Sequence, residues 1–148
     1  MNRMPIKSRI STLFLFDRNC KMIRDEKKIL IVDDITGNRS FLAGMLMYEY
    51  ELLIARDGKE ALATMAREDV DLILLGPGIP IMEGLEFCET LKANVEKGGV
   101  PIVFISDTED EEKKSVVLSI GAADYLSKPV NTKILTKRIG GILGMEHE

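Results

Sequence analysis

The sequence contains no tryptophan, one histidine and two cysteines, and only 5% of its residues are aromatic. The histidine, His147, follows the last predicted helix, so we expect neither histidine-based catalysis nor phosphotransfer from a histidine of this chain. Cys20 and Cys88 are too few and too far apart for a disulfide framework or a zinc site. This cysteine usage favours a reduced, cytoplasmic protein.

Long hydrophobic runs are also missing. No apolar stretch approaches the roughly 18 residues that a membrane-spanning helix needs. The nearest, Ile10–Phe16, follows three basic residues and has the outline of a short signal peptide. A small-residue cleavage site is missing, however, and Asp17 and Arg18 follow at once. We therefore expect neither export nor a membrane span.

Acidic residues are scarce in the first part of this chain, and the charges are unevenly distributed along it. Residues 1–28 contain eight Lys or Arg and three Asp or Glu, whereas residues 29–148 contain twelve and twenty-one. We interpret 1–27 as a basic leader and 28–148 as the folded domain. Such a leader can be a solvated tail or can touch anionic lipid or nucleic acid. A third possibility is that Met22 is the natural start.

What is present from Lys28 onward is a regular alternation of strand and helix patterns. Short apolar runs, typical of strands buried on both faces, occupy residues 28–32, 51–55, 71–75, 101–106 and 124–127. Amphipathic patterns predict helices over about 36–48, from 57, over 83–95, over 108–120 and from 131. Asp57, the pair Thr108 and Glu111, and Asn131 are the predicted helix-starting caps.

This alternation predicts an α/β fold, a doubly wound, five-stranded parallel sheet with helices on both faces. Strand order 2-1-3-4-5, the flavodoxin-like arrangement, is one of the two common solutions. Sites in such sheets lie at the carboxyl ends of the strands, near the switch between the first and third strands. The residues predicted there are Asp33, Asp34, Gly76, Ser106 and Lys128.

Four motifs at these strand ends resemble the CheY-like receiver domain of two-component response regulators. They are ILIVDD with Asp33 and Asp34, the turn leading to Pro80 and Gly84, Ser106 after the fourth strand, and DYLSKP with Tyr125 and Lys128. The resemblance covers about residues 28–143. It is specific because the four motifs occur in order, each at a strand end.

The resemblance implies a magnesium site. Asp34 would bind Mg²⁺ directly, Asp33 through water, and Gly78 through its backbone carbonyl. On their own, the two aspartates could instead simply favour the dipole of the following helix. Magnesium sites commonly use one or two carboxylates and keep several waters. We expect weak binding here, because a third carboxylate is missing.

The resemblance also implies a phosphoryl site and a switch. Ser106 would donate a hydrogen bond to a phosphoryl oxygen, and Lys128 would pair with the same group as a point charge. Tyr125 would report the state of the site to the outer surface. Without phosphorylation, Ser106 and Lys128 could be inherited structure with no present role, and Tyr125 could be ordinary edge packing.

The main departure from the family is Gly76, which stands where the family has its phosphoacceptor aspartate. Glycine has no side chain, so it cannot form an acyl phosphate, and Asp71 lies at the other end of the strand. A register shift is excluded because Pro80 and Gly84 keep their usual spacing from Gly76. Asp107 is a second departure. Its carboxylate could repel phosphate, pair with Lys128, or be solvated.

These observations predict a stand-alone receiver protein in two-component (phosphorelay) signalling that is not an enzyme and acts independently of phosphorylation. It would bind a protein partner such as a histidine kinase, another regulator or an output protein, as a monomer or weak dimer, without direct DNA binding. The alternative is a flavodoxin-like small-ligand or nucleotide-binding protein. Asp33 and Asp34 count against that alternative, because carboxylates in the first loop repel phosphate. An enzyme would need a nucleophile–base pair, which the sequence does not offer.

Overall fold

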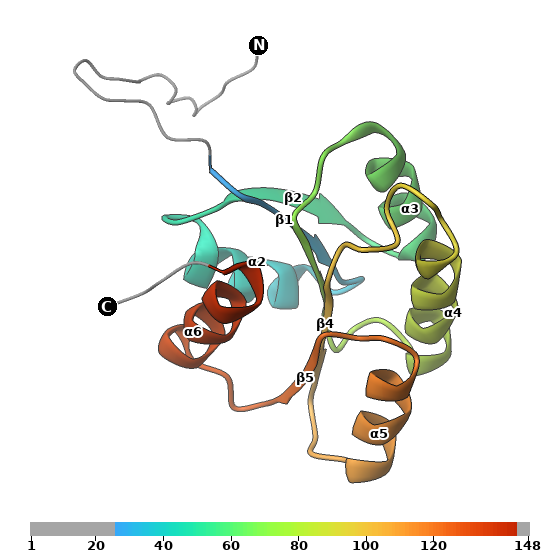
Figure 1. Ribbon diagram of the computed structural model, residues 1–148. Coiled ribbons are helices and arrows are strands. Elements are labelled where there is room, and N and C mark those ends of the chain that lie inside the picture. The colour runs from blue at the N-terminus through green and yellow to red at the C-terminus, as the bar shows by residue number, and fades with distance from the viewer. Residues whose placement is uncertain (1–25, 145–148) are drawn as a thin grey trace, which may run out of the picture.

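The computed structural model of the protein describes residues 26–144, which form one layered α/β unit (Figure 1). The leader 1–27 therefore lies almost wholly outside the described residues. The strands are β1 (Lys28–Val32), β2 (Glu51–Ala55), β3 (Leu72–Leu75), β4 (Ile102–Ser106) and β5 (Asp124–Ser127). The helices are α2 (Thr36–Leu46), α3 (Gly58–Arg67), α4 (Ile81–Lys92), α5 (Glu111–Ser119) and α6 (Thr132–Leu143).

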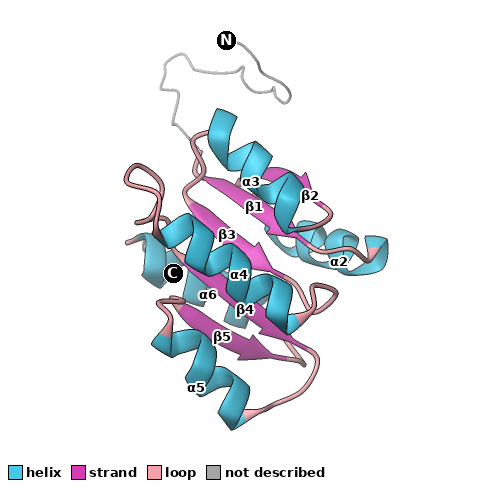
Figure 2. Cartoon of the chain, turned by 90° about the vertical axis from the view of Figure 1, so that its right-hand side faces the viewer, coloured by secondary structure: helices cyan, strands magenta, loops and turns pink. Residues whose placement is uncertain are grey.

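The strands form one parallel sheet in the order β2-β1-β3-β4-β5, as predicted (Figure 2). Its register pairs Val32 with Leu75 and Ser106 with Ser127. Parallel strands in register bring their carboxyl ends to one edge of the sheet. The residues that follow β1, β3, β4 and β5 therefore meet at that edge.

Each face of the sheet has its own hydrophobic core. Helices α3, α4 and α5 cover one face, where Ile73, Phe87 and Phe104 are among the buried side chains. Helices α2 and α6 cover the other, around Ile31, Leu74 and Leu135. Burial on both faces explains the uninterrupted apolar runs of the central strands, because neither set of alternate side chains meets water.

Two of the three predicted helix starts are confirmed. The Asp57 carboxylate accepts a hydrogen bond from the Glu60 N–H, and the Asn131 side chain accepts one from the Ile134 N–H, both at 2.8 Å. The capping box at Thr108 is wrong. Asp110 caps α5 instead by accepting from the Lys113 N–H at 3.0 Å.

Two further sequence predictions need correction. Helix α4 begins at Ile81, two residues earlier than predicted, because Pro80 occupies its N-cap position and needs no N–H partner there. The amphipathic pattern over residues 36–48 places Phe41 on the apolar face of that helix, but the Phe41 side chain of α2 is 50% exposed. Within residues 26–144, no helix has the length and apolar character required to cross a membrane.

Candidate functional site

The carboxyl edge of the sheet gathers most of the predicted site residues. Asp33 follows β1, Gly76 follows β3, Ser106 ends β4 and Lys128 follows β5. The backbone confirms this convergence, because Gly76 N–H donates to the Val32 carbonyl at 2.8 Å and Lys128 N–H to the Ser106 carbonyl at 2.9 Å. The positions that the sequence predicted are therefore brought together by two pairs of neighbouring strands.

Asp33 is fully buried, which is unusual for a carboxylate that has no ion-pair partner within residues 26–144. Its Oδ1 accepts hydrogen bonds from the Ile35 N–H at 2.8 Å and the Asn38 side-chain amide at 3.3 Å. Its Oδ2 accepts from the Gly78 N–H at 3.1 Å. Three N–H donors thus compensate the desolvated carboxylate, which points inward rather than to solvent.

The Asp33 carboxylate occupies the space beside Gly76 and Gly78. A β-carbon placed on residue 76 would collide with Asp33 Oδ2, and one placed on residue 78 would collide with Asp33 Oδ1. Both glycines are therefore required for close approach to Asp33, as long as its side chain keeps this conformation. The Asp33 carboxylate thus occupies the space that a side chain of residue 76 would need.

The other predicted magnesium ligand, Asp34, is exposed at the same edge. The Gly78 backbone meets Asp33 through its N–H rather than its carbonyl. Within the described chain, no three His, Cys, Asp or Glu side chains form a cluster able to hold a metal. The donors present would therefore suit only a largely hydrated ion, with Asp34 as the direct ligand and Asp33 contacting the ion through water.

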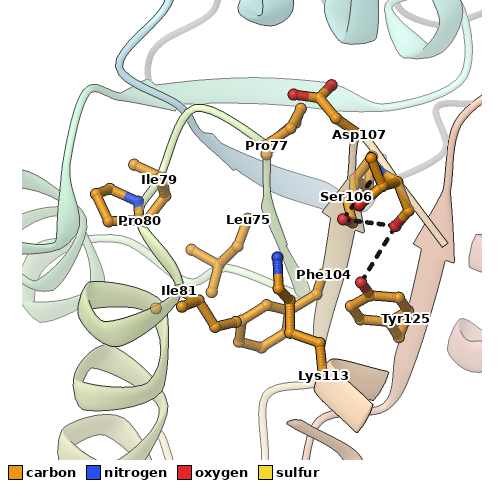
Figure 3. A pocket seen from close by; sticks show the side chains of 14 residues that line it. Leu75, Pro77, Ile79, Pro80, Ile81, Phe104, Ser106, Asp107, Lys113 and Tyr125 are labelled. Atoms are coloured by element: carbon orange, nitrogen blue, oxygen red, sulfur yellow. Dashed lines mark hydrogen bonds between the residues drawn. The ribbon is translucent and has the colours of Figure 1, made fainter. Parts of the chain in front are cut away.

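On the other half of the edge, Ser106 and Tyr125 share one acceptor. The Ser106 hydroxyl donates to the Thr108 carbonyl at 2.9 Å, and the buried Tyr125 hydroxyl donates to the same oxygen at 3.4 Å (Figure 3). The Ser106 Oγ also accepts from the Thr108 N–H at 3.3 Å. The loop after β4 is thus tied to β4 by Ser106 and to β5 by Tyr125.

Lys128 pairs with Asp107. Its Nζ lies 3.2 Å from Asp107 Oδ1, and the two side chains are 34% and 67% exposed. Asp107 is thus both paired with Lys128 and largely solvated, which are two of the possibilities that the sequence left open. The positive charge at the end of β5 is therefore already balanced from within the chain.

A cleft of about 250 Å³ opens between the loops that follow β3 and β4. Its apolar walls include Leu75, Ile79, Ile81 and Phe104, and the side chain of Tyr125 closes one end (Figure 3). Lys113, from the first turn of α5, also lines it. Gly76 also lines the cleft, whereas Asp33 does not.

The buried cysteine of α4 takes no part in this site. Cys88 lies in the core beneath α4, and burial raises the pKa of its thiol to about 11. A thiol with such a pKa carries almost no thiolate at neutral pH and is a poor nucleophile. Burial thus makes Cys88 a core residue rather than a reactive thiol in the folded domain.

With this geometry, the fold and the convergent strand ends define a receiver-type signalling domain. The family profile of response regulator receiver domains matches residues 29–140, and the chain belongs to this family. The chain is 37% identical over 113 residues to the response regulator PleD of Caulobacter vibrioides, which covers 76% of this chain but only 25% of PleD. The chain thus corresponds to about a quarter of that longer relative.

Solved structures agree with the fold. The chemotaxis response regulator CheY4 of Vibrio cholerae superposes with a TM-score of 0.72 at 30% identity, over 80% of this chain and 99% of that one. The receiver domain of a sensor histidine kinase of Pseudomonas aeruginosa, at 25% identity, gives a TM-score of 0.72 over 81% and 99%. That domain holds a magnesium ion in its active site cleft.

Sequence reasoning missed several residues of the site. Asn38 donates to the Asp33 carboxylate, and Arg39 Nη1 donates to the Asp33 carbonyl at 2.6 Å. Their spacing of five and six residues after Asp33, in the first turn of a predicted helix, is a signal that could have indicated both. No such signal in the sequence indicates that the Thr108 carbonyl accepts hydrogen bonds or that Lys113 lines the cleft.

Proposed function

We propose that this chain is a receiver domain that works without phosphorylation in two-component signalling, by binding a protein partner. The observation that carries the proposal is Gly76 at the end of β3, with the Asp33 carboxylate in the space beside it. Phosphoryl transfer to a receiver needs a carboxylate nucleophile at that strand end, and glycine provides none.

The charges around the site support the same reading. In a phosphorylated receiver, Lys128 and Ser106 would contact the phosphoryl group. Here Lys128 is paired with Asp107, and the Ser106 hydroxyl donates to the Thr108 carbonyl. Asp107 thus supplies internally the negative charge that a phosphoryl group would bring. We propose that Ser106, Lys128 and Tyr125 are remnants of the phosphoryl site and switch, held in one arrangement.

Mass spectrometry after treatment with a small phosphodonor tests the central claim. The intact mass should be unchanged after incubation with acetyl phosphate and Mg²⁺, while a receiver with an intact acceptor aspartate gains a phosphoryl group under the same conditions. A stoichiometric adduct on any residue of this chain would contradict the proposal. Peptide mapping after borohydride trapping would then locate it.

We propose that the partner is a histidine kinase, another regulator or an output protein, and that it contacts the surface formed by α5, β5 and α6. A fixed Tyr125 presents this surface in a single state, because no phosphoryl group biases one arrangement over another. Once a partner is captured, Tyr125→Ala and Lys133→Glu should weaken its binding. Lys59→Glu on α3 is the matched control, and an equal loss with all three variants would contradict this placement.

We propose weak Mg²⁺ binding centred on the exposed Asp34. The contribution of Asp33 is reduced because its two carboxylate oxygens already accept hydrogen bonds from N–H donors. Calorimetry should detect at most weak binding, which Asp34→Asn abolishes. Tight binding that survives Asp34→Asn would mean that Asp33 turns toward the metal or that another site exists.

A further inference from the structure

The cleft beside Gly76 has the size of a small-molecule site. Its volume is about 250 Å³, and its walls come from the loop after β3, the first turn of α4, the end of β4 and the first turn of α5. Pockets for drug-sized ligands span about 300–1,000 Å³. A ligand of this cleft would therefore be small, on the order of ten non-hydrogen atoms.

The floor of the cleft offers apolar contact and few free hydrogen-bonding groups. Leu75, Ile79 and Phe104 are each at most 8% exposed, yet they line the cleft. Three hydroxyl-bearing residues line the cleft, Ser106, Thr108 and Tyr125. The hydroxyls of Ser106 and Tyr125 already donate to the Thr108 carbonyl. A ligand would thus bury an apolar body here.

The charge in the cleft is provided by Lys113. The lining also contains Asp107, but its carboxylate is paired with Lys128. Among the described residues, Lys113 has no salt-bridge partner, and its ammonium group points over the cleft between Leu75 and Tyr125 (Figure 3). A cation beside apolar walls attracts an anion more strongly than one in open water.

The surroundings of the cleft restrict the charge of that anion. The segment that precedes Lys113 is acidic: residues 107–112 contain Asp107, which lines the cleft and is paired with Lys128, and also Glu109, Asp110, Glu111 and Glu112. Lys113 offers one positive charge to a ligand, so the second charge of a dianion such as a phosphate ester would stay unpaired beside apolar walls and acidic residues. The cleft therefore favours a monoanion.

We propose that this cleft binds a small organic monocarboxylate with an apolar body, with Lys113 as its counter-ion. This inference goes beyond the proposed function and does not depend on it, because no phosphoryl group takes part in the contacts. Binding would bridge the loops after β3 and β4 beside Tyr125. The ligand would thereby stabilise the loop that borders the proposed partner surface.

Chemical-shift titration of the full chain tests this proposal with benzoate as the probe. Benzoate should shift the amide signals of Ile79, Ile81 and Phe104, with a Kd of about 1 mM. Benzyl alcohol, which keeps the ring and lacks the charge, and acetate, which keeps the charge and lacks the ring, should each bind at least about fivefold more weakly. Inorganic phosphate should not compete with benzoate.

Two variants give matched controls. Lys113→Met should weaken benzoate binding by about fivefold or more, whereas Lys114→Met, on the same helix but outside the cleft, should leave it unchanged. Ile81→Trp, which fills the cleft and keeps every charge, should abolish binding. Equal affinity in Lys113→Met and the natural chain would overturn the proposal, as would benzyl alcohol binding as tightly as benzoate. Phosphorylation of the chain would contradict the proposed function and leave this result unaffected.

Discussion

The two halves of the carboxyl edge differ in how each stabilises a carboxylate. On the half formed by β1 and β3, the Asp33 carboxylate is buried and held by three N–H donors. On the half formed by β4 and β5, the Asp107 carboxylate is 67% exposed and held by the ammonium group of Lys128. The first arrangement depends on burial and exact geometry, whereas solvent screens the second. Substitutions on the first half should therefore cost far more stability.

The largest effect is expected for Gly76→Asp. The new side chain forces Asp33 out of its place, so the N–H donors of Ile35 and Gly78 lose their acceptor and two carboxylates come close together. We expect the free energy of unfolding to fall by about 3 kcal/mol in urea titrations with EDTA present.

Added Mg²⁺ should restore much of that loss, because the variant has a third carboxylate with which to bind the ion. Gly76→Ala is the control, since it introduces the same collision without a metal ligand and should not respond to Mg²⁺. A Gly76→Asp variant as stable as the natural chain in EDTA would mean that Asp33 moves at little cost.

Asp33→Asn tests the buried half without changing its shape. In this variant an amide NH₂ group replaces one carboxylate oxygen and faces the N–H group of Ile35 or Gly78, which is also a donor. We therefore expect the free energy of unfolding to fall by about 2 kcal/mol in urea titrations. Asp34→Asn is the matched control at the exposed neighbouring position and should change stability by less than about 0.5 kcal/mol. Similar losses for the two variants would remove the distinction between the buried and exposed carboxylates.

Tyr125→Phe tests the hydroxyl that joins β5 to the loop after β4. The variant keeps the buried ring and loses one long hydrogen bond to the Thr108 carbonyl, so a loss of about 0.5–1 kcal/mol is expected. Tyr48→Phe is the control, because Tyr48 is 85% exposed. The amide signals of residues 106–110 should shift in the first variant only, and no shift there would mean that the bond does not hold the loop.

The smallest effect is expected for Asp107→Asn. The pair with Lys128 is largely solvated, so its removal should change the free energy of unfolding by less than about 0.5 kcal/mol. Thermal or urea unfolding at low and high salt would measure it, with Lys128→Met as the reciprocal variant. A loss above about 1 kcal/mol in either would show that the outer half is as tightly organised as the inner one.

Much of the fold can be predicted from the sequence because its signals are local. The apolar runs identified all five strands, and Asp57 and Asn131 identified two helix starts through side chains that cap their own helices. Thr108 failed as a predicted cap. Its carbonyl accepts from the hydroxyls of Ser106 and Tyr125. The helix cap is Asp110, whose carboxylate accepts from the Lys113 N–H.

By itself, the sequence determined which residues meet at the carboxyl edge. The parallel order and the position of each motif at a strand end place Asp33, Gly76, Ser106 and Lys128 together, and no side-chain detail is needed for that. The sequence also determined that position 76 carries no side chain, which is a property of glycine alone.

Only the tertiary structure decided how the side chains at this edge are oriented and which charges pair. The Asp33 carboxylate turned inward because the β3 end offers it room and the Gly78 N–H. Asp107 found Lys128 because β4 and β5 are neighbours, and Lys113 faces a cleft that two separate loops enclose. Each of these outcomes depends on distances between segments far apart in the chain, which packing sets and local sequence patterns do not encode.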